Sequence, residues 1–173
     1  MCAIAGLIGS ISGQPLSPRA LAAMMASICH CGPDGSDTYF SPAGGVALGH
    51  NRISIIDLSE AGAQPMVDPE TGAVLVFNGK IYNFVEVRAK LEAKGHRFRS
   101  HCDTEVLLKA LVAWGRDALH RLNGMFVFAF WQPGRRRLLL ARDPLGMKPL
   151  YYWTAPGGGL AFASEIKALF HVP

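Results

Sequence analysis

The last third of the chain is a series of short apolar runs separated by proline and glycine, and this feature constrains the possible folds most. Runs of this length, bounded by turn residues, are typical of β-strands that follow one another in an antiparallel meander. After Leu122 the runs are Met125 to Trp131, Arg137 to Ala141, Leu150 to Trp153 and Leu160 to Ala163.

Earlier segments have helical spacing instead. Ser17 followed by Pro18 is typical of a helix start, and apolar residues then recur at helical spacing up to Ile28. Two further helices are expected, each followed by a glycine: Phe84 to Lys94 and Asp103 to Trp114. Helices ahead of a meander predict the α+β class with antiparallel sheets, in one compact domain.

The middle of the chain contains two more expected strands. Residues Val46 to Ile53 alternate in character and Ile55-Ile56 follow, so we expect a strand that ends in a loop from Asp57. Residues Ala73 to Phe77 lead directly into Asn78-Gly79, a dipeptide typical of tight hairpin turns. The segment 29–35, CHCGPDG, is too rich in glycine, proline and aspartate to continue a helix, so we expect a loop.

Composition excludes several classes of protein. The 173 residues are half hydrophobic and 17% charged, which is typical of a globular domain. The net charge of +4 is mild, and the one tight basic run, Arg135 to Arg137, follows a turn signal, so a hairpin tip is favoured over a nucleic-acid patch. No secretory signal begins the chain, and no apolar run is long enough to span a membrane. We therefore expect a cytoplasmic protein with free thiols.

Cysteine at position 2 has two interpretations. Amino-terminal processing removes Met1 when the next side chain is small, which leaves a thiol and a free α-amine on one residue. The amine, with a pKa of about 7.7–8.0, can then act as the base for its own thiol. Alternatively, Cys2 is a small hydrophobe at the start of a buried strand.

Eight motifs occur in order along nearly the whole chain. They are MCAIAG at the start, CGPDG at 31–35, HNRISIIDLS at 50–59, QPM at 64–66, NGKIYN at 78–83, CDTEV at 102–106, GMFVFAFW at 124–131 and ARDPLGMKPLYY at 141–152. Together they resemble the N-terminal glutaminase half of glutamine-dependent asparagine synthetases, a class II amidotransferase domain with an N-terminal nucleophile. The resemblance implies a four-layer αββα sandwich of two antiparallel sheets.

The resemblance also implies an activity. Cys2 would attack the side-chain amide of glutamine, and the thioester would hydrolyse to glutamate while ammonia passes to an asparagine-synthetase-type amidation. Residues 1–173 would be the glutaminase domain, and the ATP-dependent synthetase domain would be absent from this chain, as a C-terminal partner in a longer protein. No metal or organic cofactor is expected for this half-reaction, and a homodimer is one possible assembly.

Each matched position has an implied role. Arg52 would bind the substrate α-carboxylate, with backbone groups of Ile55 and Ile56 on the same side, because a guanidinium fork suits a carboxylate. Asp103 would bind the α-ammonium, although an aspartate there is also a good helix N-cap. Asn78 and Gly79 would form the oxyanion hole, although they are also a plain turn signal.

Three residues depart from the family pattern. Ala3, Cys31 and Lys80 stand where the family usually has glycine, arginine and glutamate. A lysine beside the substrate ammonium would repel it by about 1–4 kcal/mol at about 4 Å. A metal or redox site at Cys31 and Cys102 matches no standard zinc spacing and is not expected. Two other functions therefore stay open: a non-catalytic amino-acid-binding or regulatory module, and an amide hydrolase with a substrate other than glutamine.

Overall fold

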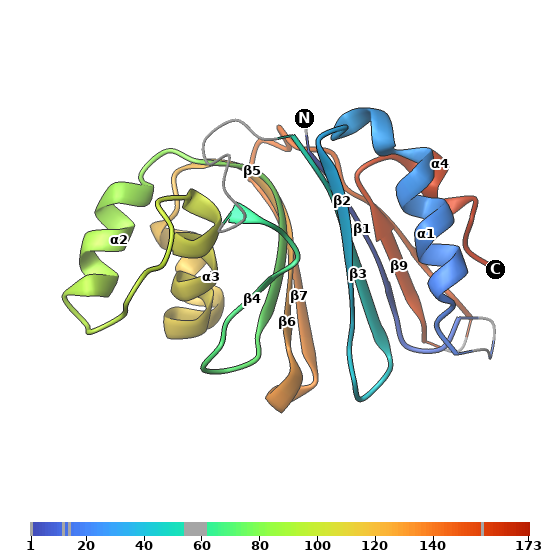
Figure 1. Cartoon of the computed structure of the whole chain (residues 1–173), viewed down its shortest axis with the longest axis horizontal. Helices are drawn as coiled ribbons and strands as arrows, with labels where there is room; N and C mark the ends of the chain where they lie inside the picture. Colours follow the sequence, from blue (N-terminus) through green and yellow to red (C-terminus); the bar gives the residue numbers. More distant parts are fainter. Residues whose placement is uncertain (1, 12, 14, 54–61, 157) are drawn as a thin grey trace. The chain divides into compact units, whose positions relative to one another are not determined.

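The computed structural model describes residues 2–11, 13, 15–53, 62–156 and 158–173. The chain divides into two compact units. Unit 1 comprises Met1–Ile53 and Lys148–Pro173, and unit 2 comprises Ser54–Met147. Each unit contains one antiparallel sheet with helices on one of its faces (Figure 1).

Unit 1 is built on a five-stranded sheet. Its strand order is β2-β3-β1-β9-β8. The strands are β1 (Ala3–Ile8), β2 (Gly35–Phe40), β3 (Val46–Arg52), β8 (Tyr151–Thr154) and β9 (Leu160–Ala163). Helices α1 (Pro18–Ser27) and α4 (Ile166–Leu169) lie over one face, and a short 3-10 turn, η1 (Cys29–Cys31), follows α1 (Figure 1).

The sequence determines the position of α1. The Ser17 hydroxyl caps the helix by accepting a hydrogen bond from the Ala20 N–H at 3.3 Å, and Pro18 occupies the first turn, as predicted. Leu21 and Met24 are buried against small sheet residues, including Ala5. These small residues let the helix approach the sheet closely, which fixes the strand that begins beside Cys2.

Unit 2 is built on a four-stranded sheet in the order β4-β5-β6-β7. The strands are β4 (Met66–Val67), β5 (Val74–Ile81), β6 (Gly124–Gln132) and β7 (Arg137–Arg142), with a 3-10 turn, η4 (Pro133–Arg135), between the last two. Helices α2 (Phe84–Glu92) and α3 (Asp103–Trp114) pack on one face, and a 3-10 segment, η3 (Gly115–Arg121), follows α3 (Figure 1). Phe128, Phe130 and Leu107 are among the fully buried residues of this core.

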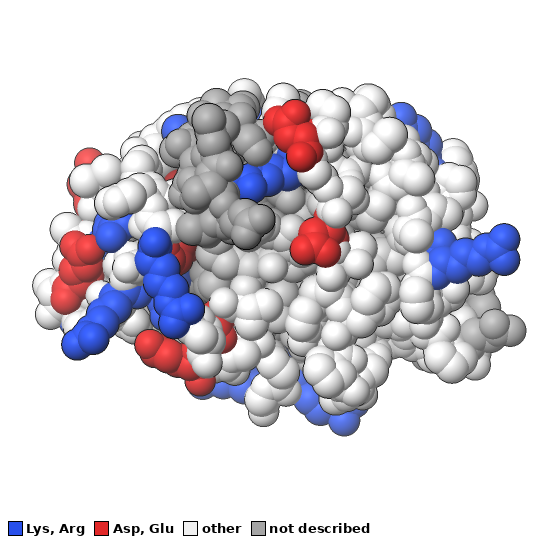
Figure 2. All heavy atoms as spheres, in the orientation of Figure 1, with Lys and Arg blue, Asp and Glu red and all other residues white. Residues whose placement is uncertain are grey.

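The surface of unit 2 that Figure 2 shows carries charges of both signs. Acidic and basic side chains are interspersed over the region of α2 and α3, so the described residues form no extended basic patch on this side of unit 2. Arg135 to Arg137 are exposed at the connection between β6 and β7, as predicted for a hairpin tip. None of the described helices combines the length and apolar character that crossing a membrane requires.

The prediction of a hairpin turn at Asn78-Gly79 was wrong. Strand β5 continues through both residues, and Asn78 pairs with Val127 while Gly79 pairs with Phe126. The glycine is required by close packing, because a Cβ atom there would lie 2.2 Å from the Met125 carbonyl oxygen. The short strands β2 and β4 and the 3-10 turn at Cys29–Cys31 were also missed by the sequence patterns.

A buried ion pair links the β4–β5 turn of unit 2 to α3. The Lys109 ammonium lies 2.6 Å from a carboxylate oxygen of Asp68, and the two side chains are 6% and 0% exposed. The Thr71 hydroxyl and N–H also donate to Asp68. Burial raises the pKa of Asp68, but the Lys109 and Thr71 hydrogen bonds outweigh it and hold the pKa below its ordinary value.

We predict that Lys109→Met lowers the free energy of unfolding by about 3–5 kcal/mol at neutral pH, because it leaves a buried carboxylate without its cation. The stabilisation from ionised Asp68 is present above the ordinary aspartate pKa of about 3.9 and is lost as pH falls through the lowered pKa, so variant and wild type should converge in strong acid. Urea denaturation measures the difference, with Lys90→Met on the exposed face of α2 as control. A loss no larger than that of Lys90→Met would contradict the role of the pair.

Candidate functional site

The Cys2 thiol is held against the backbone at the end of β3. The Ile53 N–H donates to Cys2 Sγ at 3.3 Å, and Sγ lies 3.6 Å from the Ile53 carbonyl oxygen. Cys2 is half-buried. Both backbone polar groups of Ile53 thus contact the sulfur.

Two neighbouring strands fix the backbone beside Cys2. Strand β1 pairs with β3 and with β9, and the pairing with β9 is extended by Ser164. The Ser164 N–H donates to the Ile4 carbonyl at 2.9 Å, and the Ile4 N–H donates to the Ser164 hydroxyl at 2.9 Å. The residues around Cys2 therefore have little freedom to move.

Cys2 and Arg52 belong to the same face of the unit 1 sheet. Ala3 packs against α1, so Cys2, one residue earlier, faces the opposite side. Asn51 donates to the Met25 carbonyl of α1 at 2.9 Å, so Arg52 faces away from the helix as well. Ala3 and Asn51 are directly paired, which puts Cys2 and Arg52 at matching positions. Ile55 and Ile56 lie outside the described residues.

In unit 2, the free edge of β5 presents backbone N–H groups. The Phe77 N–H donates to the Gln64 side-chain oxygen at 2.6 Å, and the Ile81 N–H donates to Asp103 Oδ2 at 2.9 Å. Alternate N–H groups of an antiparallel strand point to the same edge, so the Gly79 N–H, midway between them, points away from β6. No acceptor for it is found among the described residues.

Asn78 and Lys80 alternate with the residues that pack on α2 and α3. Phe77 and Ile81 belong to the helix-facing core, so the side chains of Asn78 and Lys80 project from the opposite face of the sheet. Asn78 is 3% exposed, whereas Lys80 is partly exposed. A side-chain amide and a backbone N–H are donor types that an oxyanion hole uses.

Asp103 is the first residue of α3, and the N-cap is Cys102, so an N-cap role for Asp103 was wrong. Its carboxylate reaches β5 instead, where it accepts from Ile81. Burial raises the pKa of Asp103, while the Ile81 N–H and the charge of Lys80 act in the opposite direction. A buried carboxylate that gains from a nearby cation is suited to an ammonium group. Lys80 supplies such a cation from within the chain.

Two positioning residues were missed by the sequence analysis. Glu105 accepts hydrogen bonds from the Arg99 N–H at 2.9 Å and the Ser100 N–H at 2.7 Å, which holds the loop ahead of α3. Gln64, within the QPM motif, accepts a hydrogen bond from the Phe77 N–H of β5. Its side-chain nitrogen also donates to the Thr104 hydroxyl at 3.5 Å. The Gln64 side chain connects β5 with the start of α3, and no local sequence pattern reveals such a connection.

The other thiols differ from Cys2 in their surroundings. Burial and a hydrogen bond to Glu165 raise the pKa of Cys31 to about 11, so this thiol stays protonated at neutral pH. Cys102 is buried in unit 2, with its sulfur 2.9 Å from the Ser100 hydroxyl. Cys29 is exposed. Neither Cys31 nor Cys102 has the surroundings of an activated nucleophile.

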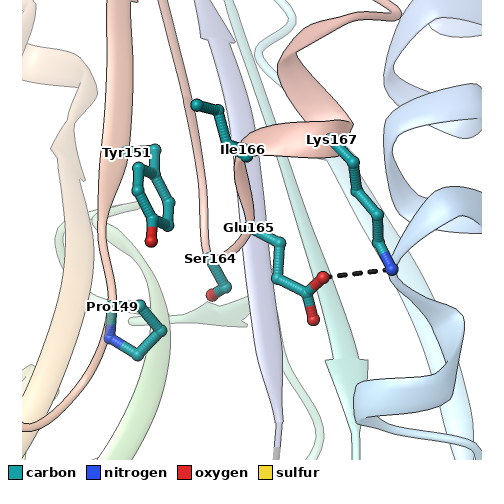
Figure 3. A pocket seen from close by; sticks show the side chains of 6 residues that line it. All are labelled: Pro149, Tyr151, Ser164, Glu165, Ile166 and Lys167. Atoms are coloured by element: carbon teal, nitrogen blue, oxygen red, sulfur yellow. Dashed lines mark ion pairs between the residues drawn. The ribbon is translucent and has the colours of Figure 1, made fainter.

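The predicted site residues thus fall into two groups, one in each unit. Cys2 and Arg52 share a face in unit 1, and Asn78, Gly79, Lys80 and Asp103 cluster at the free edge of β5 in unit 2. A hollow of about 240 Å³ in unit 1 contains none of them (Figure 3). Its lining residues are Pro149, Tyr151, Ser164, Glu165, Ile166 and Lys167.

Comparisons with known proteins place this chain among related domains. The family model described as a glutamine amidotransferase domain matches residues 1–173. Asparagine synthetase [glutamine-hydrolyzing] 3 of Bacillus subtilis is 37% identical over 100% of this chain and 28% of its own length. Asparagine synthetase [glutamine-hydrolyzing] 1 of the same organism is 42% identical over 95% of this chain and 26% of its own length. The chain therefore spans about a quarter of the length of these relatives.

A solved structure, the glutamine phosphoribosylpyrophosphate amidotransferase of B. subtilis in complex with ADP and GMP, has the same fold. It matches with a TM-score of 0.80 at 22% identity and covers 99% of this chain and 43% of that chain. The match confirms the predicted α+β fold of N-terminal-nucleophile type with two antiparallel sheets. The family model, which matches from the first residue to the last, shows that the chain belongs to the glutamine amidotransferase domain family.

Proposed function

We propose that this protein hydrolyses glutamine to glutamate and ammonia through a thioester on Cys2. The observation that carries the proposal is the half-buried Cys2 thiol, which accepts a hydrogen bond from the Ile53 N–H in a chain of the glutamine amidotransferase family. The raised pKa of Cys31 supports the same choice of nucleophile, because that thiol is kept in its unreactive form.

The reaction begins with removal of Met1, which frees the α-amine of Cys2. This amine takes the thiol proton, and the thiolate attacks the side-chain amide carbon of glutamine to give a tetrahedral oxyanion. The protonated amine returns its proton to the leaving nitrogen, so ammonia departs and a glutamyl thioester remains. Water then hydrolyses the thioester, which releases glutamate and restores the thiol. Each step uses groups of the protein and water, with no metal or organic cofactor.

The remaining site residues bind the substrate in this proposal. Arg52 pairs with the α-carboxylate, aided by backbone groups of Ile55 and Ile56, and Asp103 pairs with the α-ammonium. The Asn78 amide and the Gly79 N–H stabilise the oxyanion, and one such donor is commonly worth about 2.7–4 kcal/mol of barrier. The buried Asn78 amide and the outward direction of the Gly79 N–H support these roles.

We further propose that the ammonia is consumed by an ATP-dependent synthetase domain of the asparagine-synthetase type, located C-terminal to these residues in the complete protein. The support is the length of the relatives, of which this chain covers about a quarter. A cytoplasmic location suits the mechanism, because a reducing environment keeps a nucleophilic thiol free. A homodimer is the assembly we would test first.

The proposal predicts that purified protein releases glutamate from glutamine and has Cys2 as its amino-terminal residue. Cys2→Ala should lower glutamate release by about a thousandfold or more, since it removes the nucleophile. The matched control is Cys29→Ala, which changes an exposed thiol and should retain activity. An enzyme-coupled glutamate assay and intact mass spectrometry provide the measurements. Turnover that survives Cys2→Ala, or an active protein that retains Met1, would contradict the mechanism.

Lys80 is predicted to weaken glutamine binding by competing with the substrate ammonium for Asp103. Lys80→Glu should therefore lower the KM for glutamine roughly tenfold or more, given a like-charge repulsion of about 1–4 kcal/mol at about 4 Å. Lys90→Glu, on the exposed face of α2, makes the same charge change elsewhere in unit 2 and should leave KM unchanged. Equal effects of the two substitutions would show that only net charge matters, contrary to this account.

Asp103 is predicted to lower the stability of the fold at neutral pH and to raise the affinity for glutamine. Wild-type stability falls as pH rises from the ordinary aspartate pKa, about 3.9, through the raised pKa of Asp103, because the unfolded state ionises more readily. Asp103→Asn removes this loss but keeps an oxygen for the Ile81 N–H. The variant should be more stable than wild type at neutral pH and equally stable in acid. Its KM for glutamine should rise by about tenfold or more, since the substrate ammonium loses its counter-charge.

Urea denaturation across this pH range and steady-state kinetics test both parts of the Asp103 prediction. Asp117→Asn serves as the control, because Asp117 is exposed and burial does not act on its charge. A stability difference that stays constant with pH, or a KM equal to wild type, would show that Asp103 has neither role.

A further inference from the structure

Three side chains that the proposed reaction does not use meet in unit 1. His30 and Cys31 belong to the 3-10 turn after α1, and Glu165 lies between β9 and α4. The His30 Nε2 atom and the Cys31 Sγ atom each lie 2.9 Å from Glu165 Oε1, and they are 3.4 Å from each other. The cluster therefore combines an imidazole, a thiol and a carboxylate, which are the three ligand types that zinc prefers in proteins.

The two segments that carry these side chains are anchored to the same sheet. Glu165 follows Ser164, which forms two hydrogen bonds with Ile4 of β1. Cys31 precedes Gly32, whose Cα packs so closely on Asn51 that a Cβ would lie 2.4 Å from the Asn51 carbonyl. Because both anchors are on paired strands, the separation of the three ligands is set by the fold and not by flexible loops.

The ligand separations fit a tetrahedral zinc ion. Zinc–ligand distances of about 2.3 Å to sulfur and about 2.0–2.2 Å to nitrogen and oxygen give ligand–ligand edges of roughly 3.3–3.6 Å in a tetrahedron. The sulfur–nitrogen separation of 3.4 Å already has this value, and the two separations of 2.9 Å to Glu165 need to open by roughly half an ångström. A side-chain rotation of Glu165 is sufficient for that change.

The carboxylate is oriented for this role by a second contact. Glu165 Oε2 forms an ion pair with the Lys167 ammonium at 3.0 Å (Figure 3). The other carboxylate oxygen, Oε1, contacts His30 and Cys31. Ligating carboxylates are commonly held by such an outer contact. Metal binding would displace the Cys31 thiol proton, after which a thiolate and a carboxylate neutralise a divalent cation. His30 is exposed enough to leave a path from solvent.

We infer that His30, Cys31 and Glu165 form a binding site for a thiophilic divalent cation of the zinc type, with water as the fourth ligand. The site is separate from the glutamine chemistry, which requires no metal. Cys31 is one of the departures from the family pattern, so the site is a property of this chain's own sequence.

Cobalt(II) is the probe that tests this inference, because a sulfur ligand gives it a charge-transfer absorption that oxygen and nitrogen ligands do not. The experiment uses Cys2→Ala protein, which removes the amino-terminal thiol as a competing chelator and makes the result independent of glutaminase activity. Titration should show one bound cobalt with sulfur-to-metal absorption, and added zinc should displace it, since zinc binds such sites more tightly.

Variants locate the ligands. Cys31→Ser should abolish the charge-transfer absorption, and His30→Ala or Glu165→Gln should weaken binding by about tenfold or more because each removes one of three protein ligands. Cys29→Ser, in the same turn, should leave both absorption and affinity unchanged. Circular dichroism confirms that the variants fold. Absence of sulfur-to-metal absorption in the parent protein, its persistence in Cys31→Ser, or its loss in Cys29→Ser would overturn the inference.

Discussion

The pairing of β1 with strands on both of its sides is the constraint on which the candidate site depends. Alanines on the helix-facing side of β1 let α1 approach, and hydrogen bonds to β3 and to Ser164 hold the start of the strand. Because the strand cannot slide without breaking both ladders, the Cys2 thiol is held at the Ile53 backbone. A nucleophile positioned in this way loses little entropy when a substrate arrives.

The second group of site residues depends on the incomplete edge of β5. Strand β4 pairs only with Val74 and Leu75, so the remaining N–H groups along that edge require other partners. Side chains of Gln64 and Asp103 satisfy those on either side of Gly79, and the Gly79 N–H has no acceptor within the described part of the chain. The same geometry places Asp103 beside β5, where burial penalises its charge. An unpaired backbone N–H and a buried carboxylate both destabilise the fold, and a bound substrate can supply partners for both.

Periodicity and caps predicted most of the elements, because α1, α3 and the later strands are specified by local sequence. Ser17 capped its helix as expected, and α3 has the predicted bounds. The prediction of a turn at Asn78-Gly79 failed because a glycine can be required either by a turn or by the close approach of two strands. Only the position of the neighbouring β6 backbone distinguishes these two cases. Edge strand β2 was missed since its mostly exposed residues give no apolar alternation.

The candidate site was predictable to a different degree. Cys2, Arg52, Asn78, Gly79 and Asp103 were identified from ordered motifs. The roles of Gln64 and of the His30–Cys31–Glu165 cluster instead depend on contacts between residues more distant in sequence. Lys80 was recognised from the sequence as a departure from the family pattern. Its electrostatic effect on Asp103 became visible only in the structure, because residues 80 and 103 belong to different elements.

The central claim is that Cys2 is the residue that attacks a glutamine amide. Covalent trapping tests it most directly: the protein is incubated with a glutamine analogue that carries an electrophile in place of the amide, and the labelled peptide is identified by mass spectrometry. The account predicts one adduct per chain, on an amino-terminal Cys2, with protection by excess glutamine. Labelling of Cys29, Cys31 or Cys102 instead, or labelling that glutamine does not prevent, would contradict it.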